Sequence, residues 1–467
     1  MMPSLFTAVS GIKSQQTSLD VIANNIANAD TTGYKSSSVS FSDLLSQTLS
    51  GASSATTTSG GKNAVQVGTG VKVASTNTDM TTGSLESTGV DTDCAISGNG
   101  YFIVQDGSSY LFTKDGEFGI DADGNLNVDG HIVCGWSDYT VDTDGNYVFN
   151  TQSGVSALNL YDDGKKVMSA DATSAAALTG YVKTSASVVS GAALSVASGV
   201  TLTTSSGTVS TVSGIASALS ATSADMTTTM TLYDEQGNSY DATVSWKKYA
   251  TDSSTNTTSW YYEVSADGLN ISPSSGFVLF NSAGEMITSE NNTSGFDLTN
   301  FAATPSVAFT PTSNAVNSFT VKLDLSGVKN VTTSDSATVS VKSIDGYSAG
   351  TLNDVSVEED GTITGTYTNG KTQPLGMIAI ATFANAEGLT KVGDNMFAQS
   401  SNSGTYTAVT AGENGSGALK SGYLEMSNVD LSEEFSKMMI SQRAYQANTK
   451  VVSTCDSMLQ SLINMVG

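Results

Sequence analysis

Acidic residues are the most promising candidates for chemistry in this chain of 467 residues, and ten positions from Asp121 to Gly130 concentrate them. A calcium loop of the EF-hand type needs oxygen ligands at positions 1, 3 and 5, glycine at position 6 and glutamate at position 12. Counted from Asp121, these last two positions hold Leu126 and Ile132. Two successive hairpin turns explain the same residues, so we expect no metal site here.

Other catalytic arrangements also lack support. His131 is the only histidine, which excludes a histidine-rich metal centre and leaves a Ser-His-Asp triad resting on one residue in a turn region. The 44 acidic residues always offer carboxylate pairs for glycoside chemistry, but no pair stands out. The glycines form no phosphate-binding loop. We therefore expect a protein that is not an enzyme, with no catalytic residues, no metal and no cofactor.

The three cysteines, Cys94, Cys134 and Cys455, are far apart and odd in number, which argues against a disulfide framework. The N-terminus has no basic segment followed by an apolar core, so we predict no cleavable signal peptide. A run of about 18 apolar residues, as a membrane helix requires, is also absent from the sequence.

The charge balance excludes two classes of partner. Only 13% of the residues are charged, and the net charge is −25. Nucleic acid and anionic membrane surfaces both attract Lys and Arg, so we expect neither nucleic-acid binding nor membrane insertion. The 39% of hydrophobic residues is too high for a wholly unfolded chain.

The elements that would position any interface are two terminal helices. Apolar residues recur every seven positions near both ends, which predicts helices that pair with each other or with other copies. Such narrow stripes cannot be buried by a lone helix. The predicted self-assembly residues are Leu5, Ile12, Leu19 and Ile26 near the N-terminus, and Leu431, Phe435, Met438, Tyr445, Val452, Leu459 and Ile463 near the C-terminus.

Between the ends the pattern changes to alternation and turns. Asp-Gly pairs such as Asp115-Gly116 and Asp360-Gly361 separate short runs of β-branched and aromatic residues, for example Tyr101 to Val104. This predicts antiparallel β structure, a sandwich or barrel, so the fold class is mainly β with α-helical termini. Residues 165–225 are rich in Ser, Ala and Thr, and we leave open whether they form weak strands or a mobile insertion.

One segment near the N-terminus resembles a known family. The run from Ala23 to Lys35 is similar to the signature of the flagellar rod and hook axial proteins. From the residues alone it reads as a helix that ends in Asn-rich sequence, followed by a glycine turn and an aromatic anchor. The family-motif residues are Ala23, Asn24, Asn25, Ile26, Ala27, Asn28, Gly33, Tyr34 and Lys35.

The C-terminal region resembles the same family. Gly422 to Ser432 is similar to its other conserved end, and Gly98 to Val104 and Phe112 to Gly116 to a framework shared by rod and hook. Gly346 to Gly350 and Leu232 to Asn238 look like the hook version. Cys94 stands where the family more often has an aliphatic residue, and a role in cross-linking subunits is left open.

The resemblance implies a structural hook subunit that leaves the cell by type III export and lies in the extracellular flagellum. It would polymerise into a curved, flexible tube that transmits torque, with itself, the distal rod protein, the hook–filament junction protein, the hook cap and the export apparatus as partners. The expected domains are a terminal coiled coil (1–30 and 429–467), an extended connector (31–70), an inner β domain (71–155 and 345–428) and an outer β domain (156–344), whose number of subdomains is left open.

Three other interpretations compete with the hook subunit, one from the same family and two from other classes of protein. A distal rod protein of the same family would lack the insertion of about 190 residues between positions 156 and 344. A surface adhesin would share the Ser/Thr-rich β character, but it gives no reason for heptads at both ends. A polysaccharide-acting enzyme would share the acidic β domain and would be revealed by assays on glycans.

Overall fold

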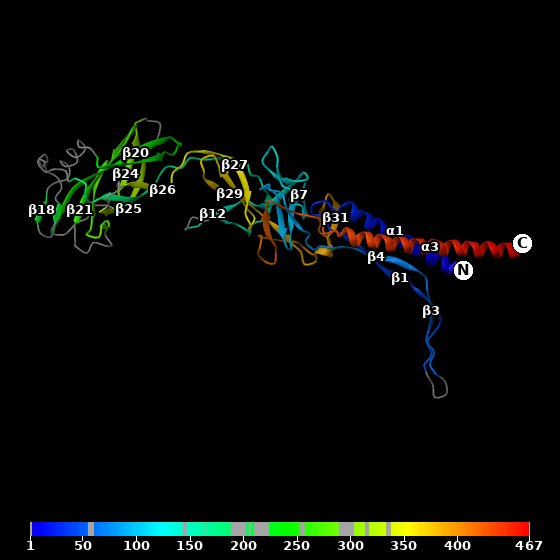
Figure 1. Ribbon diagram of the computed structural model, residues 1–467. Helices are drawn as coiled ribbons and strands as arrows, with labels where there is room; N and C mark the ends of the chain where they lie inside the picture. Colours follow the sequence, from blue (N-terminus) through cyan, green and yellow to red (C-terminus); the bar gives the residue numbers. More distant parts are fainter. Residues whose placement is uncertain are drawn as a thin grey trace. The chain divides into compact units, whose positions relative to one another are not determined.

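The computed structural model describes residues 2–54, 60–142, 147–162, 164–187, 202–204, 207–209, 224–252, 257–288, 303–312, 317–332 and 338–466 (Figure 1). The chain divides into two compact units. Unit 1 comprises Met1–Lys166, Asn353–Thr366 and Thr372–Gly467, and unit 2 comprises Val167–Leu352 and Tyr367–Lys371. Within the described residues, neither long helix combines the length and apolar content needed to cross a bilayer.

Two long helices come from opposite ends of the chain, α1 (Met2–Ala27) and α3 (Leu431–Val466). Asp430 begins α3 as its N-cap, because its Oδ1 accepts hydrogen bonds from the backbone N–H groups of Ser432 (2.8 Å) and Glu433 (3.2 Å). Glu433 and Glu434 follow in the first turn, where the helix dipole favours negative charge. The N-terminal and C-terminal elements lie side by side, blue against red in Figure 1.

The rest of unit 1 is β structure. Its main sheet has the order β28-β29-β11-β7-β8-β32-β31, and its core includes Tyr101, Phe112, Trp136 and Phe397. The strands of unit 1 are β1 (Ser37–Asp43), β2 (Ser46–Ser50), β3 (Val65–Gly68), β4 (Val71–Thr78), β5 (Leu85–Ser87), β6 (Cys94–Ser97), β7 (Tyr101–Asp106), β8 (Ser109–Thr113), β9 (Gly119–Ile120), β10 (Leu126–Val128), β11 (His131–Trp136), β12 (Tyr139–Val141), β13 (Tyr147–Phe149), β14 (Ser156–Ala157), β28 (Thr362–Tyr367), β29 (Thr372–Ile378), β30 (Ile380–Thr382), β31 (Thr390–Gly393), β32 (Met396–Ala398), β33 (Thr407–Val409), β34 (Ala418–Ser421) and β35 (Tyr423–Glu425), with a short 3-10 helix η2 (Ala386–Gly388).

Unit 2 is a β-sandwich. Four strands in the order β19-β20-β21-β23 and five in the order β22-β24-β25-β16-β26 bury a shared core that includes Trp246, Trp260, Phe309 and Leu323. Its strands are β15 (Val167–Met168), β16 (Ala175–Lys183), β17 (Leu202–Thr204), β18 (Gly207–Val209), β19 (Met226–Tyr233), β20 (Ser239–Asp252), β21 (Thr257–Ala266), β22 (Leu269–Ser272), β23 (Ser275–Phe280), β24 (Ser306–Pro311), β25 (Phe319–Val331), β26 (Val339–Ile344) and β27 (Gly350–Val357), the last of which ends in unit 1.

The prediction of a mainly β fold with helical termini is confirmed. One ladder departs from the expected antiparallel pattern, because β16 pairs in parallel with β25. A long excursion through β19 to β24 separates these strands in sequence, which gives the chain room to return in the same direction. Much of the Ser/Ala/Thr-rich stretch 165–225, namely 188–201, 205–206 and 210–223, lies outside the described residues.

The division into units differs from the expected domain boundaries at 156 and 344. Residues 156–166 belong to unit 1, because β14 pairs with β11 and Asn159 Nδ2 donates to Asn125 Oδ1 at 3.0 Å. Residues 345–352 belong to unit 2, where Tyr347 bridges to Asp171. The expected connector, 31–70, contains three strands, and with β4 it forms the antiparallel ladders β1–β4 and β2–β3.

The acidic stretch that first suggested chemistry closes a turn. Asp121 Oδ1 accepts hydrogen bonds from the N–H groups of Asp123 (3.0 Å) and Asn125 (2.7 Å), and Oδ2 accepts one from Asn125 Nδ2 (2.9 Å). Asp234 makes the same set of bonds to Gln236 and Asn238 in unit 2. These carboxylates therefore fix the path of the backbone between strands.

Candidate assembly interface

The terminal helices α1 and α3 pack against each other in antiparallel directions. Four contacts define the register: Ser4 with Cys455 (3.7 Å), Gly11 with Asn448, Ser18 with Ser441 (3.4 Å), and Asn25 with Glu434 (3.1 Å). Each contact lies seven residues from the next on both helices. This repeat is the spacing at which one face of each helix keeps meeting its partner.

Small and polar residues, together with Ile22, form this seam. Ala8, Gly11, Ser14 and Ile22 are buried on α1, and Glu434, Ser441 and Cys455 are buried on α3. At Gly11 the helices come so close that an added Cβ would lie 2.8 Å from Asn448 Nδ2. Small side chains allow this close approach, and paired polar groups keep their hydrogen bonds inside it.

The predicted stripe of α1 lies beside the seam. Leu5, Ile12 and Leu19 each follow a seam residue by one position, which turns them by about 100° around the helix. They and Ile26 are half-buried. The seam has the predicted period of seven but a different phase, because small residues pack helices more closely than the neighbouring aliphatic ones do.

On α3 the predicted residues divide into two groups. Met438, Tyr445 and Val452 are half-buried. Four others form what we call the exposed stripe, with exposed fractions of 43% for Leu431, 51% for Phe435, 37% for Leu459 and 70% for Ile463. α3 also extends beyond the start of α1 at Met2, so among the described residues those after position 457 have no α1 residue opposite them. The structure thus pairs the helices but leaves apolar side chains of α3 uncovered.

The family motif, which spans the end of α1 and the residues that follow it, builds a junction between the helices and the β structure. Asn25 is buried, donates from Nδ2 to the carbonyl of Ser37 (2.8 Å), and accepts at Oδ1 from the N–H of Ser37 (2.9 Å). The Tyr34 hydroxyl donates to Asn24 Oδ1 at 2.7 Å, and Asn28 Nδ2 donates to the carbonyl of Asn24 at 2.8 Å. The Asn-rich sequence therefore turns the chain from α1 into β1.

Gly33 lies at the tightest point of the junction. Its φ is +66°, in the region that favours glycine, and its N–H donates to the carbonyl of Glu425 at 2.7 Å. A Cβ at this position would lie 2.8 Å from the backbone nitrogen of Asp115. Ala23 and Ala27, the remaining motif residues, are exposed.

Three distant segments meet at a buried group that we call the lysine–glutamate cluster: Lys35, Lys114 and Glu425. Lys35 Nζ lies 2.5 Å from Glu425 Oε1, and Lys114 Nζ lies 3.3 Å from Oε2. The carbonyl of Thr81 accepts from Lys35 (2.7 Å), and that of Gly98 accepts from Lys114 (2.8 Å). All three side chains are at most 2% exposed, so the cluster holds the segments before α3 and after α1 together.

The cluster has two cations for one carboxylate, and this imbalance affects Lys114. Burial lowers the pKa of Lys114 to about 8, since a charged ammonium loses its hydration there. Glu425 opposes that shift, and the charge of Lys35 adds to it.

Sequence reasoning missed two residues of the junction. Lys391 Nζ donates to the carbonyl of Lys35 (2.7 Å) and lies 4.6 Å from the centre of the Tyr34 ring. Asn395 Nδ2 donates to the carbonyl of Thr32 at 2.8 Å. Neither residue belongs to a recognised motif, so no local signal could have indicated them.

The three cysteines are buried and free. Burial raises the pKa of both Cys94 and Cys134 to about 12, and for Cys94 the neighbouring Asp93 adds to this effect. Thiols in this state are weak nucleophiles. The folded subunit therefore gives no support for a cross-linking role of Cys94.

Family models match four parts of the chain. Residues 5–35 match the model described as flagella basal body rod protein, and 95–157 match the flagellar hook protein FlgE/F/G D1 domain. Residues 201–347 match the flagellar basal body protein FlaE D2 domain, and 420–465 match the flagellar basal body rod FlgEFG protein C-terminal model.

Curated relatives match the whole chain. The flagellar hook protein FlgE of Borreliella burgdorferi is 34% identical over 476 residues, covering 100% of both chains. The protein of the same name from Treponema pallidum is 32% identical over 497 residues, again covering 100% of both. Among solved structures, the hook protein FlgE2 of Helicobacter pylori aligns with a TM-score of 0.45 and 14% identity over 73% of this chain and 100% of that one.

Full-length identity to hook proteins favours the hook subunit over the distal rod protein and the surface adhesin. The family is structural, and its members form part of an extracellular appendage. The chain belongs to the flagellar hook protein family and is a structural subunit of the bacterial flagellum.

Proposed function

We propose that this subunit polymerises through α1 and α3 into a curved, flexible tube that works as a universal joint and transmits torque from rod to filament. Membership of the hook family implies self-polymerisation within the flagellar axis. The observation that carries the finer proposal is the exposed stripe on α3, where Phe435 is 51% exposed beside a seam that is already closed and Ile463 is 70% exposed beyond the end of that seam.

The seam and the exposed stripe have different roles in this proposal. Contacts such as Asn25 with Glu434 satisfy the small and polar face within one subunit. The apolar side chains that remain in water would gain free energy when a second copy covers them. Identical subunits that join through two different surfaces form an open helical polymer when their rotation does not close a ring.

The flexibility proposed for the tube follows from the low content of charged residues. Charged residues make up 13% of the chain, so few ion pairs are available to fix one geometry between neighbouring β domains. We assign the helices to a firm inner layer of the tube and the β domains to outer layers that slide past each other through hydrated contacts.

The family resemblance also suggests partners at both ends of the tube. We propose contacts with the distal rod protein, the hook–filament junction protein and the hook cap, and passage through the flagellar export apparatus. Nucleic acid and membrane insertion have no part in this function.

Electron microscopy of the purified chain tests the proposal, and the expected result is a curved tube. Replacing Leu431 and Met438 together by Asp should abolish tubes, because two carboxylates would have to be buried in the helical layer. Circular dichroism should still report folded β structure in this variant. Normal tubes from the double variant would refute the assignment of Leu431 and Met438 to the assembly interface.

A further inference from the structure

The β2–β3 ladder is a hairpin without a hydrophobic cover. Every residue of β2 and β3 is exposed, and Leu49, Val65 and Val67 are 63%, 53% and 45% exposed. A two-stranded hairpin is marginally stable in water unless another surface covers one of its faces. The exposed aliphatic side chains therefore favour packing of this hairpin against a partner surface in the assembled protein.

The hairpin carries a single charged residue. Between Ser46 and Gly68 the only charged residue is Lys62, which is exposed and bridges to Ser53 beyond the paired strands. The hairpin thus presents an aliphatic surface with one cation. A matching surface needs an apolar floor and carboxylates at its rim.

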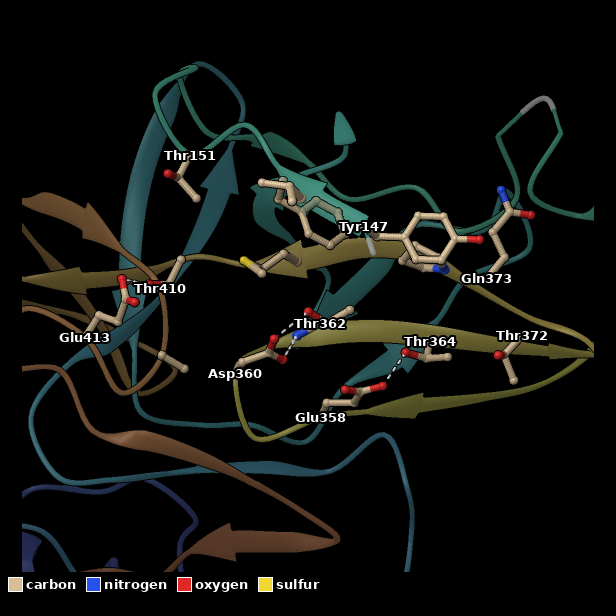
Figure 2. Close-up of a pocket in the computed structure, with 15 residues that line it drawn as sticks. Tyr147, Thr151, Glu358, Asp360, Thr362, Thr364, Thr372, Gln373, Thr410 and Glu413 are labelled. Atoms are coloured by element: carbon tan, nitrogen blue, oxygen red, sulfur yellow. Dashed lines mark hydrogen bonds between the residues drawn. The ribbon is translucent and has the colours of Figure 1, made fainter. Parts of the chain in front are cut away.

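Unit 1 contains such a surface, a groove of about 670 Å³. Phe149, Pro374 and Met377 are its buried apolar lining, and the exposed Tyr147 adds an aromatic ring. Figure 2 shows Glu358, Asp360 and Glu413 around the same groove, close to the strands β28 and β29. Three carboxylates beside an apolar surface complement the hairpin in both charge and polarity.

Hydrogen bonds hold the carboxylates in place. Thr364 Oγ1 donates to Glu358 Oε1, and Thr410 Oγ1 donates to Glu413 Oε2, each at 2.8 Å. Asp360 accepts from the N–H of Thr362 at 2.9 Å and thereby closes the β27–β28 turn. Glu358 and Glu413 can thus be replaced with less risk to the turn than Asp360.

We propose that the β2–β3 hairpin of one subunit docks in this groove of a neighbouring subunit in the tube, with Lys62 at the rim formed by Glu358 and Glu413. The inference rests on the proposed polymerisation. It supplies the two unlike surfaces that a head-to-tail contact between identical subunits requires. A tube brings every hairpin close to other copies, so a weak contact becomes effective through its repetition.

Site-directed cross-linking tests the contact directly. One batch of protein carries Lys62→Cys, a second carries Glu413→Cys, and the two are mixed before assembly and mild oxidation. We expect abundant covalent dimers from the mixture and few when either variant is assembled and oxidised alone, because each chain carries one exposed cysteine and the native cysteines are buried. As a matched control, Lys72→Cys, at an exposed position on β4, replaces Lys62→Cys and should give few dimers.

Charge reversal gives an independent readout. Lys62→Glu should raise the critical concentration for assembly about fivefold, the size expected for losing one exposed ion pair. Adding Glu413→Lys should restore the value to within about twofold, because the pair is then reversed rather than lost. Lys72→Glu should leave it nearly unchanged.

The outcomes separate the docking contact from polymerisation itself. Tubes that form without cross-linked dimers, or dimers that are equally abundant with Lys72→Cys, overturn the docking contact and leave the proposed function intact. An unchanged critical concentration for Lys62→Glu also overturns it. Failure of the unmodified chain to form tubes refutes the proposed function, and this inference falls with it.

Discussion

Replacing Phe435 by Ala measures what the exposed stripe contributes to assembly. The Phe435 side chain is 51% exposed in the subunit. An aromatic side chain buries roughly 200 Å² when fully covered, so about 100 Å² remains to be covered by another copy. At about 25 cal/mol per Å² this area is worth about 2.5 kcal/mol, of which alanine would retain a small part.

The loss of about 2 kcal/mol corresponds to a roughly 30-fold rise in the critical concentration for polymerisation. Sedimentation of tubes over a series of total protein concentrations measures this value. The folded subunit should also lose stability, because the other half of the Phe435 side chain is covered within it, and the higher helix propensity of Ala offsets only a small part of that loss. Its free energy of unfolding, from urea titration of dilute monomer, should fall by up to about 2 kcal/mol, so the critical concentration is measured under conditions in which the variant is folded.

Gln442→Ala is the matched control, since Gln442 occupies the same heptad position one repeat later and is exposed. This variant should assemble like the unmodified chain. If Phe435→Ala leaves the critical concentration within about twofold, the stripe is not covered in the polymer and the area calculation does not apply. If both variants assemble poorly to the same degree, the effect is general to α3 rather than specific to an apolar contact.

Four further substitutions test the seam and the junction. Gly11→Leu should separate α1 from α3 and lower the free energy of unfolding, measured by urea titration, by about 1–3 kcal/mol. Gly11→Ala should lower it less, because alanine is smaller than leucine and favours helix over glycine. Equal effects of the two variants would contradict a close seam. Glu425→Gln should lower the free energy of unfolding by about 3–5 kcal/mol, because two buried lysines lose their carboxylate. A change below about 1 kcal/mol would refute the role of the lysine–glutamate cluster in holding these segments together. The folded pKa of Lys114 lies below its ordinary value of 10.5, so folding favours the neutral amine and stability from this group should rise between about pH 8 and pH 10.5. Its slope should be at most about 1.4 kcal/mol per pH unit, and unfolding curves of Lys114→Met over that range should lack it; identical slopes would contradict the shift.

Much of the fold follows from local pattern. The seven-residue repeat from Leu431 to Ile463 predicts α3 almost to its ends, and Asp-Gly pairs mark turns such as the one closed by Asp360. These features depend on neighbours in sequence, so sequence reasoning reaches them. The parallel pairing of β16 with β25 does not, because both strands have the same alternation whichever direction the partner runs.

The recognised motifs indicated where the junction lies in the sequence, but not which contacts require each of its residues. Asn25, Gly33, Tyr34 and Lys35 were identified by resemblance, yet the reason for each residue type lies in contacts with distant segments. Lys35 meets Glu425 across 390 positions of sequence. Lys391 packs on Tyr34 from a segment with no motif.

The sequence alone determined that two heptad helices lie at the ends of a β-rich chain and that they resemble those of flagellar axial proteins. Only the tertiary structure decided which face of α1 meets α3. A period of seven gives the spacing of contacts but not their phase, and every one of the seven positions repeats equally well. The phase was set by how closely the backbones can approach, which is why Gly11 and Ser18 lie in the seam while Phe435, one position after the seam residue Glu434, remains half exposed.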